Sequence, residues 1–294
     1  MTAATTTPGA LRQLLGSSRP LSWINTAYPF AAAYLLAGGG VDAALVIGTL
    51  FFLIPYNLLM YGVNDVFDHE SDLRNPRKGG VEGIVLDRRF HRITLWAAGL
   101  STLPFAVALL AMGSAASAVV LVIVLAAVVG YSAPGVRLKE RPVLDSLTSS
   151  THFTGPALFG LVFTGAPVGL TAVASLVAFF LWGMASHAFG AVQDVQPDRE
   201  AGIGSIATVI GAAPTVRLAI ALYAAAGLAM LLTPWPAVLA GLLVLPYILS
   251  IWPFRSVPDA QAEQANRGWR RFLWLNLLTG FLLTQLLIWI ALTS

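Results

Sequence analysis

Long stretches without a charged residue most constrain what this chain can fold into. Six such stretches are bounded by charges: Arg19 to Asp42, Asp42 to Asp65, Arg92 to Arg137, Asp145 to Asp194, Arg217 to Arg255, and everything after Arg271. A helix needs about 20 apolar residues to cross a bilayer. The shorter stretches therefore have room for one membrane-spanning helix each, and the longer ones for two.

The composition agrees with a membrane protein. The chain has 294 residues, of which 57% are hydrophobic and only 11% charged, whereas soluble domains carry about 25% charged residues. It has no cysteine, so disulfides and thiolate metal sites are excluded. Residues 1–17 lack the pattern of a cleaved signal peptide, and we expect them to form a flexible tail.

The predicted fold is an all-α membrane protein, with about nine membrane-spanning helices in a single domain over residues 1–294. Breaks at Gly113-Ser114, Thr164–Pro167 and Thr233–Pro236 divide the longer uncharged stretches. The helices are predicted at roughly 21–40, 43–63, 92–112, 115–131, 146–163, 170–192, 214–232, 236–254 and 271–291.

The distribution of charges predicts the orientation. With nine spans, all 17 Lys and Arg residues fall on the side of the N-terminus, and of the 14 acidic residues only Asp42 falls on the other side. Lys and Arg are enriched in cytoplasmic loops. We therefore expect a multi-pass protein of the cell membrane whose N-terminus and charged loops face the cytoplasm.

A first acidic motif follows the second predicted span. Its polar members are Asn64, Asp65, Asp68 and Asp72. On a helix Asn64, Asp68 and Asp72 share one face, and Asp65 lies close to it. The simplest structural explanation is a solvated helix end, and Glu70, which lies off this face, is expected to contact water.

A second motif, Asp194 and Asp198, repeats the four-residue spacing at the end of another apolar segment. Carboxylates at the end of a membrane helix are costly and repel one another. Mg²⁺ removes the repulsion, since it binds one or two carboxylates together with substrate phosphates and water. We therefore expect the two motifs to hold Mg²⁺ ions that bind a diphosphate.

Basic residues that could bind phosphate oxygens lie in the neighbouring loops. Arg77 and Lys78 follow the first motif, and Arg137 and Lys139 follow the fourth predicted span. Arg and Lys side chains bind phosphate well, although cytoplasmic loops are rich in them for other reasons. His187 precedes Asp194 by seven residues and either lines a cavity or is a packed, hydrogen-bonded histidine.

At these residues the chain resembles the UbiA superfamily of intramembrane prenyltransferases. Asn64-Asp65-x-x-Asp68-x-x-x-Asp72 is similar to the first motif of the family, and Asp194-x-x-x-Asp198 to the second. The resemblance implies a helical bundle around a central cavity that opens to the bilayer. It also implies Mg²⁺ ions that hold a prenyl diphosphate, with Tyr131, Arg137 and Lys139 near the phosphates.

The expected site follows from the motifs and the resemblance together. Asn64, Asp68, Asp194 and Asp198 are expected to be catalytic. The expected metal ligands are Asn64, Asp65, Asp68, Asp72, Asp194 and Asp198. The diphosphate is expected to contact Arg77, Lys78, Tyr131, Arg137 and Lys139.

The segments 18–30 and 73–83 resemble the lycopene elongase branch of this superfamily. That branch implies dimethylallyl diphosphate as donor, lycopene as acceptor and C45 or C50 carotenoids as products. The expected surroundings are membrane lipid, where association with other carotenoid enzymes is possible. No nucleic-acid partner is expected. Gln196 departs from the superfamily pattern, because many members carry an acid there.

Two alternatives remain open from the residues. One is prenyl transfer from a longer donor to an aromatic acceptor, as in quinone synthesis. The other is a cation-coupled transporter that uses Asp68, Asp72, Asp194 and Asp198 as its ion site. Transporters place such sites near the bilayer midplane, whereas these acids lie at helix ends next to basic loops, and this favours a phosphate ligand.

Overall fold

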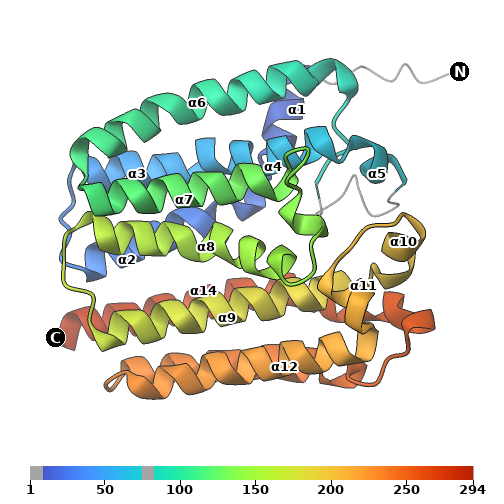
Figure 1. The fold of residues 1–294 in the computed structure, drawn as a ribbon. Coiled ribbons are helices and arrows are strands. Elements are labelled where there is room, and N and C mark those ends of the chain that lie inside the picture. Colours follow the sequence, from blue (N-terminus) through green and yellow to red (C-terminus); the bar gives the residue numbers. More distant parts are fainter. Residues whose placement is uncertain (1–8, 75–82, 294) are drawn as a thin grey trace, which may run out of the picture. The chain divides into compact units, whose positions relative to one another are not determined.

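The computed structural model describes residues 9–74 and 83–293, apart from the side chains of Ser71, Arg74 and Leu273. This part of the chain folds into helices joined by short connections, which confirms the all-α class (Figure 1). Its contacts fall into two compact units, Met1–Arg137 with Gly155–Ala166, and Leu138–Thr154 with Pro167–Ser294. The sequence predicts a single domain, and we describe each unit by itself.

Seven stretches of the described residues are long and apolar enough to cross a membrane: Ala43–Phe67, Arg88–Met112, Ala115–Ser132, Leu170–Val192, Ala212–Leu232, Ala237–Phe254 and Asp259–Thr293. The predicted number of nine is not confirmed. Of the two remaining predicted spans, 21–40 contains a helix of only 13 residues, Ile24–Leu36. The other, 146–163, lies in a helix whose first half is rich in Ser and Thr.

The first unit contains the N-terminal helices. They are α1 (Ala10–Ser17), α2 (Ile24–Leu36), α3 (Ala43–Leu53), α4 (Pro55–Phe67), α5 (His69–Arg74), α6 (His91–Met112), α7 (Ala115–Ser132) and residues 155–163 of α8 (Leu144–Phe163). The predicted span 43–63 is thus two helices. Pro55 is the first residue of α4, a position that tolerates its missing N–H.

Aromatic side chains form the core of the first unit. Phe52 lies at its centre, with ring centroids 5.2 Å from Phe30, 5.1 Å from Tyr56 and 5.8 Å from Phe159. These four side chains are almost completely buried. They come from α2, α3, α4 and α8, so the cluster ties the helix that carries the first acidic motif to three others.

Residues 10–17, which the sequence predicts as part of a flexible tail, form α1 in the structure. Gln13 and Ser17 on this helix are buried, whereas Leu11 and Leu15 are exposed. Gln13 and Ser17 therefore face the unit, and two leucines share the exposed side with Arg12. Exposed leucines are not expected on a helix that faces only water.

The second unit contains the remaining helices. They are residues 144–154 of α8, α9 (Leu170–Val192), α10 (Val195–Glu200), α11 (Ile206–Ile210), α12 (Ala212–Ala229), α13 (Leu245–Ile251) and α14 (Asn266–Thr293). Several 3₁₀ segments connect them, including Ala237–Val244 and Asp259–Ala265.

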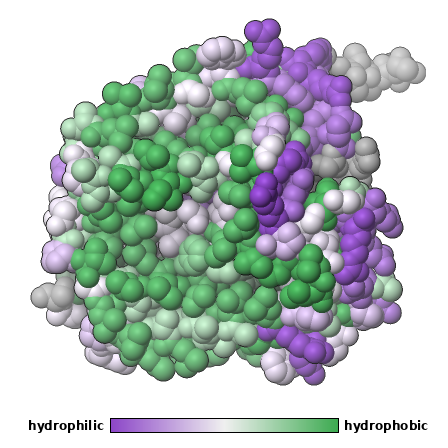
Figure 2. Space-filling model, viewed as in Figure 1, coloured by the Kyte–Doolittle hydropathy of each residue, from purple (hydrophilic) through white to green (hydrophobic). Residues whose placement is uncertain are grey.

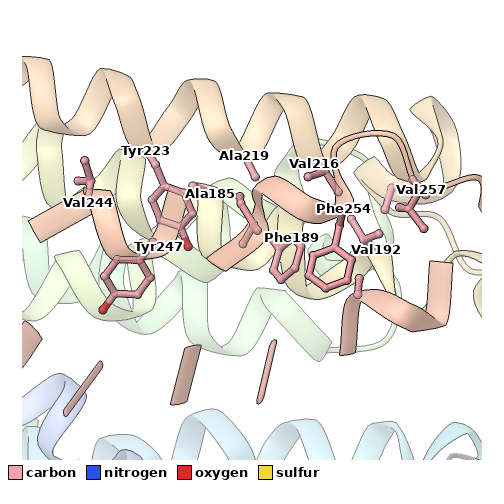
Figure 3. Close-up of a cluster of buried hydrophobic side chains, with 14 of the residues drawn as sticks. Ala185, Phe189, Val192, Val216, Ala219, Tyr223, Val244, Tyr247, Phe254 and Val257 are labelled. Carbon is pink, nitrogen blue, oxygen red and sulfur yellow. The ribbon is translucent and has the colours of Figure 1, made fainter. Parts of the chain in front are cut away.

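Small residues on α9 and α12 allow these helices to pack closely around a few large rings. Ala185 and Ala219 are fully buried between them. Figure 3 shows Tyr223 from α12 beside Tyr247 from α13, and their ring centroids lie 5.4 Å apart. Phe189 from α9 approaches Phe254 in the same way, at 6.0 Å. Close packing of small residues is the usual basis of helix association in membranes.

The surface of each unit agrees with a membrane environment. Hydrophobic side chains cover the flanks of the long helices, and hydrophilic side chains gather toward the helix ends (Figure 2). Trp96, Leu100 and Leu103 on α6, for example, are each at least 60% exposed. Such surfaces are unsuited to water and indicate contact with lipid.

We expect Gly160→Ala to destabilise the first unit. A Cβ at this position would lie 2.6 Å from the Phe30 carbonyl oxygen on α2, and such overpacking costs about 1–3 kcal/mol. The unfolding temperature in detergent should fall. Gly99→Ala on α6 is the matched control, because a Cβ there meets nothing within 4 Å, and its unfolding temperature should not fall.

We expect Asp145→Ala to destabilise the second unit. The buried carboxylate accepts hydrogen bonds from the backbone N–H groups of Ser146 at 2.7 Å and Ile206 at 2.9 Å. Loss of the acceptor leaves a buried donor unsatisfied, which costs about 1–3 kcal/mol. Thermal unfolding measures the loss, with the exposed Glu263→Ala as control. Equal unfolding temperatures of the two variants would contradict a stabilising role of Asp145.

Candidate functional site

The first acidic motif lies where α4 ends and α5 begins. Asn64 and Asp65 are in the last turn of α4, Asp68 lies between the two helices, and Asp72 is in α5. Backbone hydrogen bonds from Asp68 N to Asn64 O at 2.9 Å and from Asp72 N to Asp68 O at 2.8 Å keep the four-residue helical repeat across the junction. Asp68 and Asp72 are 7% and 6% exposed, so both carboxylates are buried.

The second acidic motif lies where α9 ends and α10 begins. Asp194 lies between the two helices, and Asp198 is in α10. The backbone N of Asp198 donates to the Asp194 carbonyl oxygen at 2.9 Å. Both residues are partly exposed, whereas Gln196 between them is exposed. The acid that many superfamily members carry at the position of Gln196 would therefore point toward solvent in this chain.

The two motifs share one local backbone design. Asp68 has φ −102° and ψ 5°, and Asp194 has φ −101° and ψ 1°. Both angles fall in the sparsely populated bridge region, where many active-site residues lie. A helix ends just before Asp68 in the first motif and just before Asp194 in the second, and a helix of 6 residues then carries Asp72 or Asp198. The equal spacing in the sequence is therefore matched by equal local geometry.

Two further residues of the first unit contact the first motif. The Oδ1 atom of Asn64 accepts a hydrogen bond of 2.8 Å from Ser132 Oγ at the end of α7. The guanidinium of Arg137 lies 3.5 Å from Asp68 Oδ1. Arg137 has φ 41°, a strained value for a residue other than glycine. A cation therefore lies beside this carboxylate, and the contact of Arg137 with phosphate stays a prediction.

The other predicted phosphate contacts are distributed differently. Arg77 and Lys78 lie outside the described residues. Tyr131 lies in α7 next to Ser132, in the first unit. Lys139 lies in the 3₁₀ segment Leu138–Glu140, at the start of the second unit. Glu70 is exposed and forms an ion pair with Arg88, as expected for a residue off the shared face.

Asp65 has contacts that the sequence did not predict. It is completely buried, and its carboxylate accepts hydrogen bonds from Ser17 Oγ at 2.7 Å and from Arg19 Nη2 at 3.2 Å. Both donors belong to the N-terminal segment. The sequence places Asp65 close to the face of Asp68, but the structure shows it bound to residues 48 and 46 positions earlier in the chain.

The carboxylates fit a magnesium site that substrate completes. Among the residues that the structure describes, no three His, Cys, Asp or Glu side chains are grouped so that they could hold a metal ion. Mg²⁺ usually binds only one or two carboxylates and takes its other ligands from phosphates and water. The first motif offers Asp68 and Asp72 besides the already bound Asp65, together with the amide oxygen of Asn64. The second motif offers Asp194 and Asp198, so the donors are of the right kind.

Polar contacts around the second motif were also missed by sequence reasoning. Asp145 on α8 binds the first N–H of α11, and the neighbouring Ser146 Oγ lies 3.2 Å from His187 Nδ1. His187 is therefore a hydrogen-bonded histidine, one of the two alternatives left open. Arg199 donates to Thr208 O and pairs with Asp259 at 2.6 Å. The lone charge of Asp145 at the start of a predicted span was the available signal.

Comparison with known proteins shows the family to which the chain belongs. Residues 26–290 match the model of the UbiA prenyltransferase family. A lycopene elongase/hydratase of Corynebacterium glutamicum is 53% identical over 95% of this chain and 97% of its own length. The C(50) beta-cyclic carotenoids biosynthesis protein LbtBC of Dietzia sp. is 55% identical over 96% of this chain, which spans 66% of that protein.

Solved structures show the same fold. A UbiA homolog from Archaeoglobus fulgidus, bound to DMAPP and Mg²⁺, covers 91% of this chain and 98% of its own, with a TM-score of 0.65 and 18% sequence identity. A UbiA homolog from Aeropyrum pernix covers 87% of this chain and 97% of its own, with a TM-score of 0.62 and 16% identity. The chain belongs to the UbiA prenyltransferase family, and its sequence similarity places it in the lycopene elongase branch.

Proposed function

We propose that this membrane prenyltransferase transfers dimethylallyl groups from dimethylallyl diphosphate to the ends of lycopene, giving C45 and then C50 carotenoids. One observation carries the proposal: the chain is 53% identical to a lycopene elongase/hydratase over 97% of that protein's length. The paired aspartate motifs with matching backbone geometry support the chemistry, because prenyl transfer requires a held diphosphate.

Mg²⁺ is the proposed cofactor, and it would neutralise the charge that develops on the departing diphosphate. The residues that would hold it are Asn64, Asp68 and Asp72 in the first motif, and Asp194 and Asp198 in the second. Arg137, which already lies beside Asp68, would bind diphosphate oxygens, and Arg77, Lys78, Tyr131 and Lys139 are proposed to do the same.

The proposed reaction breaks the allylic C–O bond of the donor and releases diphosphate. The allylic carbon then forms a bond with a carbon of the terminal double bond of lycopene, which leaves a tertiary cation. That cation loses a proton to give an alkene, or it takes up water and loses a proton to give an alcohol. The chain's role is to bind the diphosphate, orient the allylic carbon and exclude bulk water until the new bond forms.

Location and partners complete the proposal. The protein is proposed to lie in the cell membrane with its N-terminus and both motifs on the cytoplasmic side, which is the side where a water-soluble diphosphate is available. Lycopene would enter from the lipid. All 17 Lys and Arg residues fall on one side when nine spans are assumed. The positive-inside rule then makes that side cytoplasmic.

Labelled dimethylallyl diphosphate, lycopene and Mg²⁺ added to membranes that contain the protein test this function. We expect label in C45 and C50 carotenoids, and we expect none after EDTA, because the carboxylates alone repel the diphosphate. Transfer to an aromatic acceptor from a longer donor would replace lycopene elongation by the quinone-type reaction. No transfer to either acceptor, together with cation uptake into vesicles, would indicate a transporter.

Asp68→Asn and Asp194→Asn test the roles of the two motifs. Each variant should fold normally and lose transferase activity by at least about 100-fold, the scale on which a single electrostatic catalytic group acts. Glu70→Gln and Glu200→Gln are matched controls, since both are exposed glutamates on the short helices that follow Asp68 and Asp194, and their activity should be close to that of the wild type. Full activity of both Asn variants would contradict the assigned site.

A further inference from the structure

The N-terminal segment binds the last turn of α4 through a buried, charged contact. Ser17 Oγ and Arg19 Nη2 donate to the two carboxylate oxygens of Asp65 at 2.7 Å and 3.2 Å. The guanidinium of Arg19 also lies over the ring of Tyr61, at 4.2 Å from its centroid. Tyr61 and Asp65 are one turn apart on α4, so Arg19 spans the last turn of the helix. We call these four residues the clamp.

The backbone around the clamp is built to hold Arg19 in place. Arg19 has φ 51°, a left-handed conformation that costs energy for any residue with a side chain. Gly83 packs directly against its guanidinium, because a Cβ at Gly83 would lie 2.9 Å from Arg19 Nε. Gly83 itself has φ 103°. Arg19 thus has a strained backbone, and the residue that packs against its guanidinium must be a glycine, because a Cβ at position 83 would collide with the arginine.

The buried polar side chains of α1 also hold this segment against α4. Its buried Ser17 binds Asp65, and its buried Gln13 accepts a hydrogen bond from the backbone N of Asp87 at 3.3 Å. Its exposed Leu11 and Leu15 face away. One side of α1 thus contacts the end of α4 and the segment that leads into α6. The other side, with exposed Leu11, Arg12 and Leu15, suits the interface between lipid and water.

Comparison of the two motifs separates Asp65 from the pair Asp68 and Asp72. Asp68 and Asp194 have the same backbone conformation, and Asp72 and Asp198 follow each by four residues. The residue three positions before the first aspartate is Asp65 in one motif and Ala191 in the other. An aspartate pair with the same geometry therefore forms without an acid at that position.

We propose that Asp65 is a positioning residue, not a metal ligand, and that the clamp fixes the end of α4 so that Asn64 and Asp68 are correctly oriented. This inference deepens the proposed function and rests on it. It removes Asp65 from the metal ligands that the sequence predicts. A carboxylate already bound to a hydroxyl and a guanidinium, and completely buried, has its charge balanced within the protein.

Steady-state kinetics of Arg19→Gln, Asp65→Asn and the double variant test the clamp. Each single variant should lower kcat by about 100-fold, the loss that a misplacement near 1 Å can cause. The KM for dimethylallyl diphosphate and the Mg²⁺ concentration for half-maximal rate should stay within about threefold, because the metal ligands remain. The double variant should be no slower than the slower single variant, since both changes break one contact.

A binding measurement separates positioning from metal ligation without relying on activity. Mg²⁺ with inorganic diphosphate should raise the unfolding temperature of detergent-solubilised Asp65→Asn as much as that of the wild type. If this increase disappears in Asp65→Asn but persists in Arg19→Gln, Asp65 is a metal ligand and the proposal is wrong. Equal kcat in all variants, with lower stability alone, would also overturn it.

Two controls keep the test decisive. Arg89→Gln breaks an exposed ion pair with Asp87 in the same unit, and it should leave kcat unchanged. Ser17→Ala removes one hydrogen bond and leaves the ion pair. If Arg19→Gln does not fold, Ser17→Ala should still lower kcat with unchanged KM, and an unchanged kcat would contradict the clamp.

Failure of the proposed function would give a different result. If the wild-type protein transfers its prenyl group to an acceptor other than lycopene, the same kinetic comparison applies with that acceptor. If it transfers none, the coupling of Arg19 and Asp65 is read from the unfolding temperatures of the single and double variants. Additive losses there would overturn the clamp, whichever reaction the enzyme performs.

Discussion

Buried carboxylates are the constraint on which both units depend. Asp65 and Asp145 are completely buried, and Asp68 and Asp72 nearly so, in a chain whose helices are built to face lipid. A charge removed from water in this way requires compensation. Asp145 obtains it from two backbone N–H groups, Asp65 from a hydroxyl and a guanidinium, and Asp68 in part from Arg137. These contacts help to hold α1, α11 and the segment that follows α7 in place within their own units.

The partners that offset the buried negative charge differ from one carboxylate to another. Asp145 and Asp65 are each bound by at least two donors within the protein, so they act as structural anchors. Asp68 and Asp72 sit at a helix junction beside an arginine, which suits groups that exchange protein contacts for a metal and a diphosphate. The bridge-region conformation at Asp68 and Asp194 turns a single continuous helix into a long helix and a short one. That junction allows two carboxylates to be presented from a membrane helix without placing them in the lipid.

Part of the fold could be predicted because a lipid environment leaves few alternatives. Charge-free stretches of sufficient length must be helices, since the backbone has no other partner in a bilayer. The number of membrane-spanning helices is harder to predict than the helical class. Residues 24–36 form a helix shorter than a bilayer, and α8 begins with polar residues whose contacts, such as Ser146 with His187, are made only in the folded unit. Hydropathy cannot register partners that are far apart in the sequence.

The sequence by itself determined the membrane class, the two aspartate pairs and their four-residue spacing, because helical periodicity and charge are local properties. Tertiary structure decided which partners each acid has. Asp65 and Asp68 are three residues apart and similar in the sequence, yet Asp65 binds Ser17 and Arg19 while Asp68 lies beside Arg137. The partners of both acids come from distant segments, and only the packing of α1 and α7 against α4 brings them within hydrogen-bond or ion-pair distance.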